Sequence, residues 1–463
     1  MATSSSIAGS LEDLLVETAG RRRLVSVTAP VDVADPSAAV LSSRLAGERW
    51  FCWEQPDRDG FAIAGLGAAH EIVSRGPGRF DDAVTGAERL TRARVAREPT
   101  DLPAGAGPVW VGGFAFDPHG GREPHWSSFP PALLVMPELS LHRSGERTLL
   151  TLCAVSGTGE DPAAKAARLE ARVASLREGP LPLPDPHPTG GIRIASALSP
   201  GAFERSVENA VARIGAGELE KVVLGREVVI EAPRAHDPAP LYGALRELFP
   251  SCFCFCCGSP EAAFCGASPE LLVRRSGAGA ATVALAGSTR RSADPSVDDH
   301  LGQQLLLSEK DRVEHEIVAR RIERALRPHA VWVEAEPEPS LVKVANIQHL
   351  ATPIHAQLSA PRSTVELAGL LHPTPAVGGE PREAALAAIR ELEDLDRGWY
   401  AGPVGWMDAA EDGEFCVALR SALLRDRTAH LYAGGGIVAR SDPAAELAET
   451  EVKLGALLPL IVG

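Results

Sequence analysis

Two helical stretches of this chain carry the carboxylates best placed to do chemistry. The run 298–326 has good helix formers and no internal proline, and its apolar period puts Glu314 on the same stripe as Ile317. Burying an ionised carboxylate without a partner costs on the order of several kcal/mol, so Glu314 must meet a cation, a group of donors or a metal. From spacing alone, a helix-edge ion pair with Lys310 or Arg321 is an equally good interpretation.

A second helix, predicted from Pro443 to Leu458, repeats this arrangement. Glu446, Glu449 and Lys453 are spaced by three and then four residues, which places them on one helical face. If both helices turn their carboxylates toward one point, the oxygen ligands suit Mg²⁺ better than zinc, which prefers His and Cys. The simpler alternative for Glu449 and Lys453 is a surface ion pair worth a few tenths of a kcal/mol at most, by rough estimate.

Lys221 and Glu270 are the candidates for proton transfer. Lys221 begins a predicted strand; if it is partly buried near a metal it loses its proton more readily and becomes a plausible general base. Glu270 lies between apolar segments, where a raised pKa would suit a general acid. Both residues have mundane alternatives, a solvent-exposed lysine and a structural carboxylate.

Several further residues could recognise an anionic ligand. Arg420 lies within a predicted strand, 414–424, among apolar residues, where a bound carboxylate would be a suitable partner. The glycine run 434–436 could let backbone amides approach an anion, although such a run is more often a turn. His349 could be a core histidine, which is the commoner outcome.

The elements that must position these residues fall into two regions. Residues 1–190 look β-rich with few helices, and residues 191–463 alternate helices and strands. The strands expected in the first region are 23–31, 49–53, 61–66, 109–116, 132–141 and 148–155, and the helix expected there is 162–177. A connector, 179–191, contains five prolines and is the best boundary. The resulting fold class is α/β, of the α+β type, with antiparallel sheet flanked by helices.

Bulk composition restricts the function. A formal net charge of −15 argues against a nucleic-acid partner, because phosphate binding depends on basic surface. The eight cysteines show no regular framework, which fits a reducing compartment. Alternation at Cys252, Cys254 and Cys256 is typical of a strand with one small-residue face rather than of a thiolate metal site. No signal-like segment or long apolar run is found, so a cytoplasmic protein without membrane association is expected.

The second half resembles the chorismate-utilising enzymes, and most of all the isochorismate synthases. The resemblance covers about residues 199–460, and its motifs occur in the family's order. They are 221–224 (KVVL), 266–272 (GASPELL), 285–288 (LAGS), 308–315 (SEKDRVEH), 349–353 (HLATP), 371–375 (LHPTP), 404–406 (VGW), 433–438 (AGGGIV) and 449–454 (ETEVKL). The first half resembles the family only loosely, through 111–117. This resemblance implies one large α/β unit, in which two antiparallel sheets pack together with helices outside.

The resemblance also implies roles for individual residues. Glu314 and Glu449 would hold Mg²⁺, with Glu446 near it through water, and the metal would bind the ring carboxylate of chorismate. Lys221 would deprotonate the water that attacks C2, and Glu270 would protonate the hydroxyl that leaves C4. The residues that would line the substrate are Gly287, Ser288, His349, Arg420, Gly434, Gly436 and Lys453.

The same resemblance separates this chain from some relatives. Family members that use ammonia generally lack the lysine found here at 221, and they work with a glutaminase, so water is the expected nucleophile and no glutaminase partner is expected. Salicylate synthases share the same base and acid and then eliminate pyruvate, so that activity remains an alternative. An inactive chorismate-binding homologue is a third, which retention of Lys221, Glu270, Glu314 and Glu449 disfavours. A monomer is expected.

Overall fold

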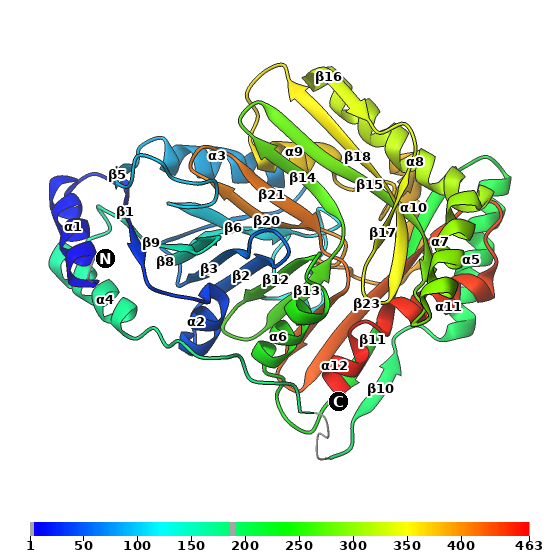
Figure 1. Ribbon diagram of the computed structural model, residues 1–463, viewed down its shortest axis with the longest axis horizontal. Helices are drawn as coiled ribbons and strands as arrows, with labels where there is room; N and C mark the ends of the chain where they lie inside the picture. Colours follow the sequence, from blue (N-terminus) through cyan, green and yellow to red (C-terminus); the bar gives the residue numbers. More distant parts are fainter. Residues whose placement is uncertain (1–3, 186–189, 463) are drawn as a thin grey trace.

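Two large β-sheets form the centre of the molecule, and helices cover their outer faces (Figure 1). The computed structural model describes residues 4–185 and 190–462. Within these residues one sheet has thirteen strands, in the order β10-β11-β23-β22-β13-β12-β2-β3-β8-β9-β1-β5 with β19 beside β11. The other has ten, in the order β16-β18-β15-β14-β21-β20-β6-β7-β4 with β17 beside β18. Most neighbours are antiparallel, and β1 with β5 is a parallel pair, which confirms the predicted fold class.

The thirteen-stranded sheet consists of β1 (Leu24–Val31), β2 (Trp50–Gln55), β3 (Phe61–Leu66), β5 (Val95–Arg97), β8 (Leu139–Ser144), β9 (Arg147–Val155), β10 (Arg193–Ser196), β11 (Lys221–Glu231), β12 (Phe253–Gly258), β13 (Ala263–Ser268), β19 (Gly379–Glu380), β22 (Ser421–Arg425) and β23 (Thr428–Ile437). The ten-stranded sheet consists of β4 (His70–Ser74), β6 (Val109–Phe114), β7 (Ala132–Met136), β14 (Leu271–Ser276), β15 (Gly279–Arg290), β16 (Ala330–Ala335), β17 (Ser340–Lys343), β18 (Ile347–Leu358), β20 (Pro403–Asp408) and β21 (Gly413–Val417). The α-helices are α1 (Ser4–Glu17), α2 (Pro36–Ser43), α3 (Arg79–Thr91), α4 (Pro162–Ala174), α5 (Pro200–Gly215), α6 (Pro238–Leu248), α7 (Pro295–Leu307), α8 (Glu309–Leu326), α9 (Thr364–Leu371), α10 (Arg382–Leu392), α11 (Pro443–Leu454) and α12 (Leu458–Val462), and the short 3₁₀ helices are η1 (Pro124–Trp126) and η2 (Arg327–His329).

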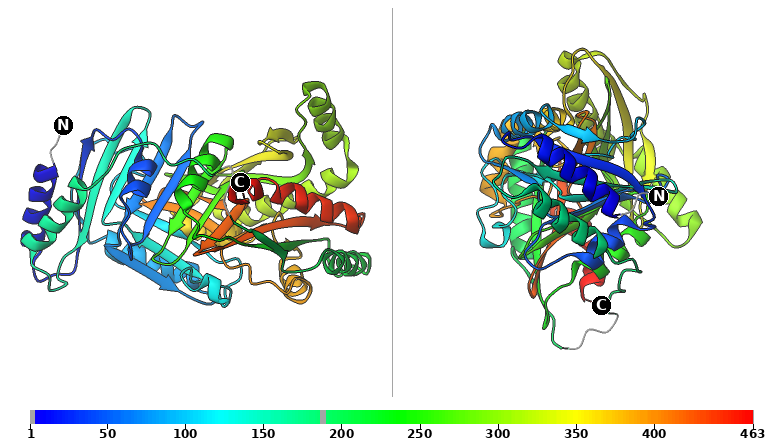
Figure 2. Two further views of the ribbon diagram at one scale, coloured as in Figure 1. Left: turned by 90° about the horizontal axis from the view of Figure 1, so that it is seen from below. Right: turned by 90° about the vertical axis from the view of Figure 1, so that its left-hand side faces the viewer.

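Both sheets run through the two halves of the chain. In the larger sheet β2 pairs with β12, and in the smaller sheet β6 pairs with β20. Figure 2 shows the first-half helices α1 and α4 at one end of the elongated molecule and α5, α7 and α11 near the other. Part of the predicted proline-rich connector, with Pro186 and Pro188, lies outside the described residues.

The main core fills the space between the sheets. It contains large aromatic side chains from both, among them Trp53 and Phe255 from the larger sheet and Trp406 from the smaller. On β12, Phe253, Phe255 and Cys257 face this core, whereas Cys254 and Cys256 face a second core that also includes residues of α2 and α6. The predicted small-residue face of this strand is therefore confirmed.

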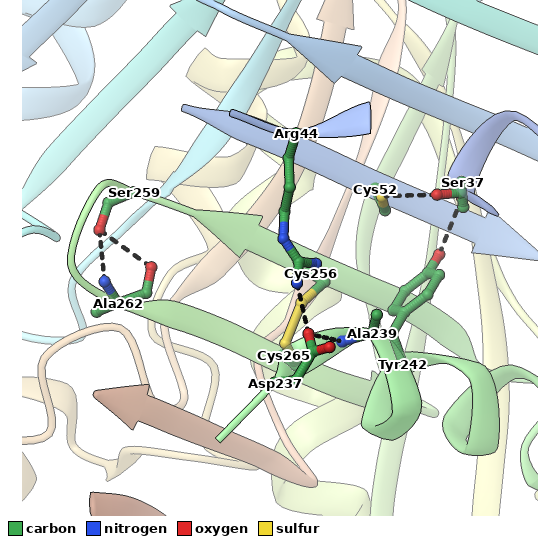
Figure 3. The surroundings of a disulfide bond; sticks show 10 residues. All are labelled: Ser37, Arg44, Cys52, Asp237, Ala239, Tyr242, Cys256, Ser259, Ala262 and Cys265. Carbon is green, nitrogen blue, oxygen red and sulfur yellow. Dashed lines mark hydrogen bonds and ion pairs between the residues drawn. A yellow bond between two sulfur atoms is a disulfide. The ribbon is translucent and has the colours of Figure 1, made fainter. Parts of the chain in front are cut away.

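One disulfide joins two neighbouring strands of the larger sheet (Figure 3). Cys256 on β12 lies directly opposite Cys265 on β13, and the two sulfurs are bonded. The cysteine spacing had pointed to a reducing compartment and no disulfide framework, and it did not anticipate this bond. The other six cysteines are free and buried.

The helix predicted over 298–326 is in fact two helices. Ser308 adopts an extended conformation, and its hydroxyl accepts a hydrogen bond from the backbone N–H of Asp311, so α7 ends at Leu307 and α8 starts at Glu309. A serine that can cap a helix breaks an otherwise continuous helical pattern without proline or glycine. Similarly, the C-terminal helix α11 ends at Leu454 rather than at Leu458.

Two predicted strands each proved to be two strands in different sheets. The run 132–141 divides at Pro137 into β7 of the smaller sheet and β8 of the larger. The run 414–424 divides into β21 and β22, and Arg420 lies between them with φ of +46°. The prediction that Arg420 lies within a strand is therefore wrong. Alternation of apolar residues does not reveal a change of sheet, because both strands are buried.

The first half also contains more helix than the sequence indicated. Besides the predicted helix α4, with Asp161 as its N-cap, it has α1, α2 and α3. The signal for α2 was present, since Asp35 caps it and Pro36 occupies its first position. Within the part of the chain that the structure describes, no helix combines the length and apolar character needed to cross a bilayer.

Candidate active site

A cavity opens between the sheets beside α8 and α11. Ten of the twelve residues predicted for the site line it: Glu270, Gly287, Ser288, Glu314, His349, Arg420, Gly434, Gly436, Glu449 and Lys453. Lys221 and Glu446 lie directly behind this lining, against Gly436 and Gly435. Residues far apart in the sequence thus converge on one site.

Lys221 and Glu314 form a buried ion pair at the edge of the cavity. Lys221 starts β11 and is fully buried, and its Nζ lies 2.9 Å from Glu314 Oε1 on α8. This Nζ makes no hydrogen bond of ordinary geometry within the described residues. The pair needs Gly436 on β23, because a Cβ there would lie 2.2 Å from Glu314 Oε1 and 3.1 Å from Lys221 Cε. Because its ion-pair partner is Lys221, Glu314 does not form the helix-edge pair with Lys310 or Arg321 that its spacing also allowed.

The carboxylates of α11 have their own polar partners. Glu449 Oε1 lies 2.7 Å from Lys453 Nζ and accepts a 2.9 Å hydrogen bond from the Ser288 hydroxyl. Burial opposes ionisation of Glu449, but Lys453 and Ser288 outweigh it and lower its pKa to about 2. Glu446 Oε1 lies 2.7 Å from Lys310 Nζ, and also accepts from Ser441 at 2.7 Å. Glu449 is thus ionised at neutral pH.

The three carboxylates Glu314, Glu446 and Glu449 all act on Lys310. Burial opposes the charge of Lys310, yet Glu446, Glu449 and Glu314 together raise its pKa, which shows that all three act on one lysine. Burial and then the charge of Glu449 raise the pKa of Glu446, and Glu446 Oε2 is buried without a hydrogen-bond partner among the described residues. A buried carboxylate oxygen without a partner could ligate Mg²⁺ or a similar hard cation.

Glu270 lies where the chain passes from β13 in the larger sheet to β14 in the smaller sheet. Its backbone N–H donates to Ser268 Oγ and its carbonyl accepts from the Val417 N–H, so the backbone is fixed on both sides. Burial raises the pKa of its carboxyl to about 7, although Lys221 and Arg420 act in the opposite direction. A carboxyl that titrates near neutrality can donate a proton in a reaction.

Arg420 also occupies a crossing point between the sheets, and it contacts His349 on β18. Arg420 Nη2 lies 3.3 Å from His349 Nε2. Burial, together with the charges of Arg420 and Lys453, lowers the pKa of His349 to about 3, so the imidazole is neutral. Buried Arg420 has no carboxylate within ion-pair distance among the described side chains, so it can bind an anionic ligand.

Gly434 and Gly436 lie within β23 rather than in a turn, and Gly287 makes an irregularity in β15. Gly287 has φ of +75°, and a Cβ there would lie 3.0 Å from Cβ of Asp311. Gly287 therefore allows α8 and β15 to approach each other closely beside the cavity.

The sequence analysis missed several residues of this site. Tyr400 lines the cavity, and its hydroxyl would lie 2.9 Å from a Cβ at Gly434. Arg397 lines it too and is held by Glu393, which also accepts from the Gly225 N–H at 2.5 Å. These residues follow the predicted helix at 382–392, and the short Asp-Arg-Gly-Trp-Tyr stretch there was an available signal. Lys310 was considered only as a helix-edge partner.

The chain belongs to the chorismate binding enzyme family, whose model matches residues 10–462. It is 40% identical over 436 residues to the salicylate biosynthesis isochorismate synthase of Pseudomonas aeruginosa. This match covers 94% of this chain and 89% of that protein. The isochorismate synthase MenF of Bacillus subtilis is 34% identical, and the match covers 95% of this chain and 94% of that protein. The resemblance inferred from the motifs is confirmed.

Solved structures agree with this assignment. The menaquinone-specific isochorismate synthase MenF from Escherichia coli is similar with a TM-score of 0.81 and 28% identity, covering 99% of each chain. The anthranilate synthase component I from Streptococcus pneumoniae has a TM-score of 0.67 at 20% identity, covering 86% of this chain and 92% of that one. The second likeness concerns the fold alone.

Proposed function

We propose that this protein is a Mg²⁺-dependent isochorismate synthase that isomerises chorismate to isochorismate. The observation that carries the proposal is the common cavity that Glu270 lines and behind which Lys221 lies, next to Glu314 and Glu449. The printed names of the relatives from Pseudomonas aeruginosa and Bacillus subtilis support the same activity.

Binding of a dianionic substrate by a protein with net charge −15 requires local positive charge. Arg420 and Lys453 supply it from two sides of the cavity. Glu314, Glu449 and Glu446 would hold Mg²⁺, which when bound offsets carboxylate charge and orients the ring carboxylate of the substrate. Neutral His349 can hydrogen-bond the substrate without adding charge.

The chemistry then needs one base and one acid on opposite sides of the ring. Lys221 is paired with Glu314 in the structure, and it would have to be neutral to accept a proton from the water molecule whose oxygen bonds to C2. A cation held by Glu314 would favour the neutral lysine by like-charge repulsion. The double bonds shift, the bond between C4 and its hydroxyl breaks, and Glu270 gives its proton to the leaving oxygen. One water is consumed and one is released, so the net reaction is an isomerisation. Positioning of water and ring in one cavity provides much of the rate gain.

The first test is product analysis after incubation of the purified protein with chorismate and Mg²⁺, with an EDTA control. We expect isochorismate in equilibrium with chorismate, only when Mg²⁺ is present. Salicylate with pyruvate would instead indicate that elimination follows, and binding of chorismate without any product would indicate an inactive homologue.

The same assay tests the acid–base pair. Lys221→Ala and Glu270→Gln should each lower turnover by about 10²–10⁴-fold while Mg²⁺ binding persists. Lys343→Ala is the matched control, because Lys343 lies on β17 and pairs with Asp298 and Asp299 outside the cavity lining. Undiminished turnover in both active-site variants would contradict the assigned roles.

A further inference from the structure

A second group of potential metal ligands lies outside the cavity lining. His125 belongs to η1, in the connection from β6 to β7, whereas Glu227 lies on β11 and His430 on β23. In the register of these two strands Glu227 is opposite Tyr432, and His430 is two residues from Tyr432. Residues opposite one another, or two apart, share a face of the sheet. Glu227 and His430 therefore project to the same side, where η1 covers them.

The three side chains are in close contact. His430 Nδ1 lies 2.8 Å from Glu227 Oε1, and His125 Nε2 lies 3.9 Å from the same oxygen. The two imidazoles stack, with ring centroids 4.1 Å apart. One ligand atom from each residue lies within 4.8 Å of the other two. This is a compact set of two nitrogens and one oxygen.

The charge balance of this group is incomplete. The Glu227 side chain is 10% exposed, and among the described residues its ion-pair partners are the two histidines, with no lysine or arginine. His125 Nε2 is buried and makes no hydrogen bond in the described structure. A buried nitrogen without a partner, facing a buried carboxylate, is costly unless a cation lies between them.

We propose that His125, Glu227 and His430 bind a divalent cation of the zinc type, separate from the carboxylate cluster of the cavity. Two imidazoles and one carboxylate are a donor set that zinc takes in sites with an open fourth position. Mg²⁺ prefers oxygen ligands, so the two sites differ in the metal they select. Coordination requires the stacked rings of His125 and His430 to turn until their nitrogens converge.

A metal here would act on the cavity wall. Tyr432, on the same face as Glu227, stacks on Tyr400 with ring centroids 5.1 Å apart, and both tyrosines line the cavity. Tyr432 also stacks on Trp126, the neighbour of His125 in η1. Fixing η1 against β11 and β23 would thus stiffen the tyrosine side of the cavity without contact between this metal and the substrate.

The test uses the full chain, stripped of metal and then saturated with Mg²⁺ so that the carboxylate cluster is occupied. Zn²⁺ is titrated by calorimetry, and Co²⁺ by visible absorption, because four-coordinate Co²⁺ with nitrogen ligands absorbs far more strongly than octahedral Co²⁺ with oxygen ligands. We expect one equivalent of Zn²⁺ to bind to the wild type and the Co²⁺ protein to show the strong bands.

His125→Gln and His430→Gln should each weaken Zn²⁺ binding by at least about tenfold and abolish the strong Co²⁺ bands. His119→Ala, a change of an exposed histidine in the same connection, should leave both unchanged. Unaltered Zn²⁺ affinity in both variants, or Zn²⁺ that is displaced by added Mg²⁺, would overturn the proposal. A weak octahedral Co²⁺ spectrum of the wild type would overturn it as well, whether or not the variants fold.

Discussion

Glu270 illustrates how a single buried side chain can link stability and chemistry. Its pKa of about 7 lies above the ordinary value of 4.5, because burial penalises the charged form. The folded state therefore holds this proton more tightly than the unfolded state does. Its stabilising contribution is complete below about pH 4.5 and is lost as the pH rises to about 7, which amounts to about 3 kcal/mol.

This pKa predicts two pH effects that Glu270→Gln should remove. If Glu270 is the general acid, kcat of the wild type falls as the pH rises above about 7, because the proton to be donated is lost. Thermal unfolding should show wild-type stability decreasing relative to Glu270→Gln between about pH 4 and pH 8. A stability difference independent of pH would show that the carboxyl is not buried in its neutral form.

Gly436 should tolerate no side chain. In Gly436→Ala the new Cβ would overlap Glu314 Oε1 and push against Lys221, so we expect Mg²⁺ affinity to fall by about tenfold or more and kcat by about 10²-fold. Calorimetry and the product assay measure these effects. Gly215→Ala, at the end of α5 where a Cβ meets nothing within 4 Å, is the control and should behave as the wild type. Equal behaviour of the two variants would argue against the close approach at 436.

At the scale of elements, β11 is held in place by a buried ion pair. Arg397 and Glu393 are almost fully buried, and Arg397 donates to the Val223 and Val377 carbonyls at 2.9 and 2.8 Å. Val223 lies two residues beyond Lys221 on the same strand, and Val377 lines the cavity. This pair therefore ties β11 to the wall of the cavity.

Removing one member of the Arg397–Glu393 pair should strongly lower the free energy of unfolding. Arg397→Leu should destabilise the protein by about 3–5 kcal/mol, because it leaves the charge of Glu393 buried and unpaired. Adding Glu393→Leu should recover part of this loss, as chemical denaturation of the single and double variants would measure. A double variant no more stable than Arg397→Leu would mean that backbone hydrogen bonds, rather than the uncompensated charge, dominate.

Most elements of the second half could be predicted, because strands such as β11 and helices such as α5 carry clear end signals: Lys221 after a glycine turn, and Ser199 followed by proline. The break between α7 and α8 at Ser308, and the passage from one sheet to the other at Arg420, could not be predicted. A capping serine and a positive φ leave the apolar pattern of the sequence unchanged. The site residues were identifiable through motif resemblance. Their convergence was not, because it depends on crossings between two sheets.

At the scale of the whole molecule, the two halves share both sheets. Separately produced chains 1–190 and 191–463 should fail to fold, since each would expose long strand edges at β2 and β12 or at β6 and β20. Circular dichroism and limited proteolysis would show this, and the intact chain should unfold in one cooperative transition. A stable, chorismate-binding 191–463 fragment would contradict this expectation and establish an independent second domain.

The shared sheets also determine when this chain can fold as a ribosome makes it. β6 emerges early, but its partner β20 begins only at Pro403, far along the chain. Until then the edge of β6 that pairs with β20 has no neighbouring strand. Contacts of such long sequence separation slow folding and prolong exposure to aggregation. We therefore expect the nascent first half to expose a strand edge, and with it a risk of aggregation, until β20 emerges.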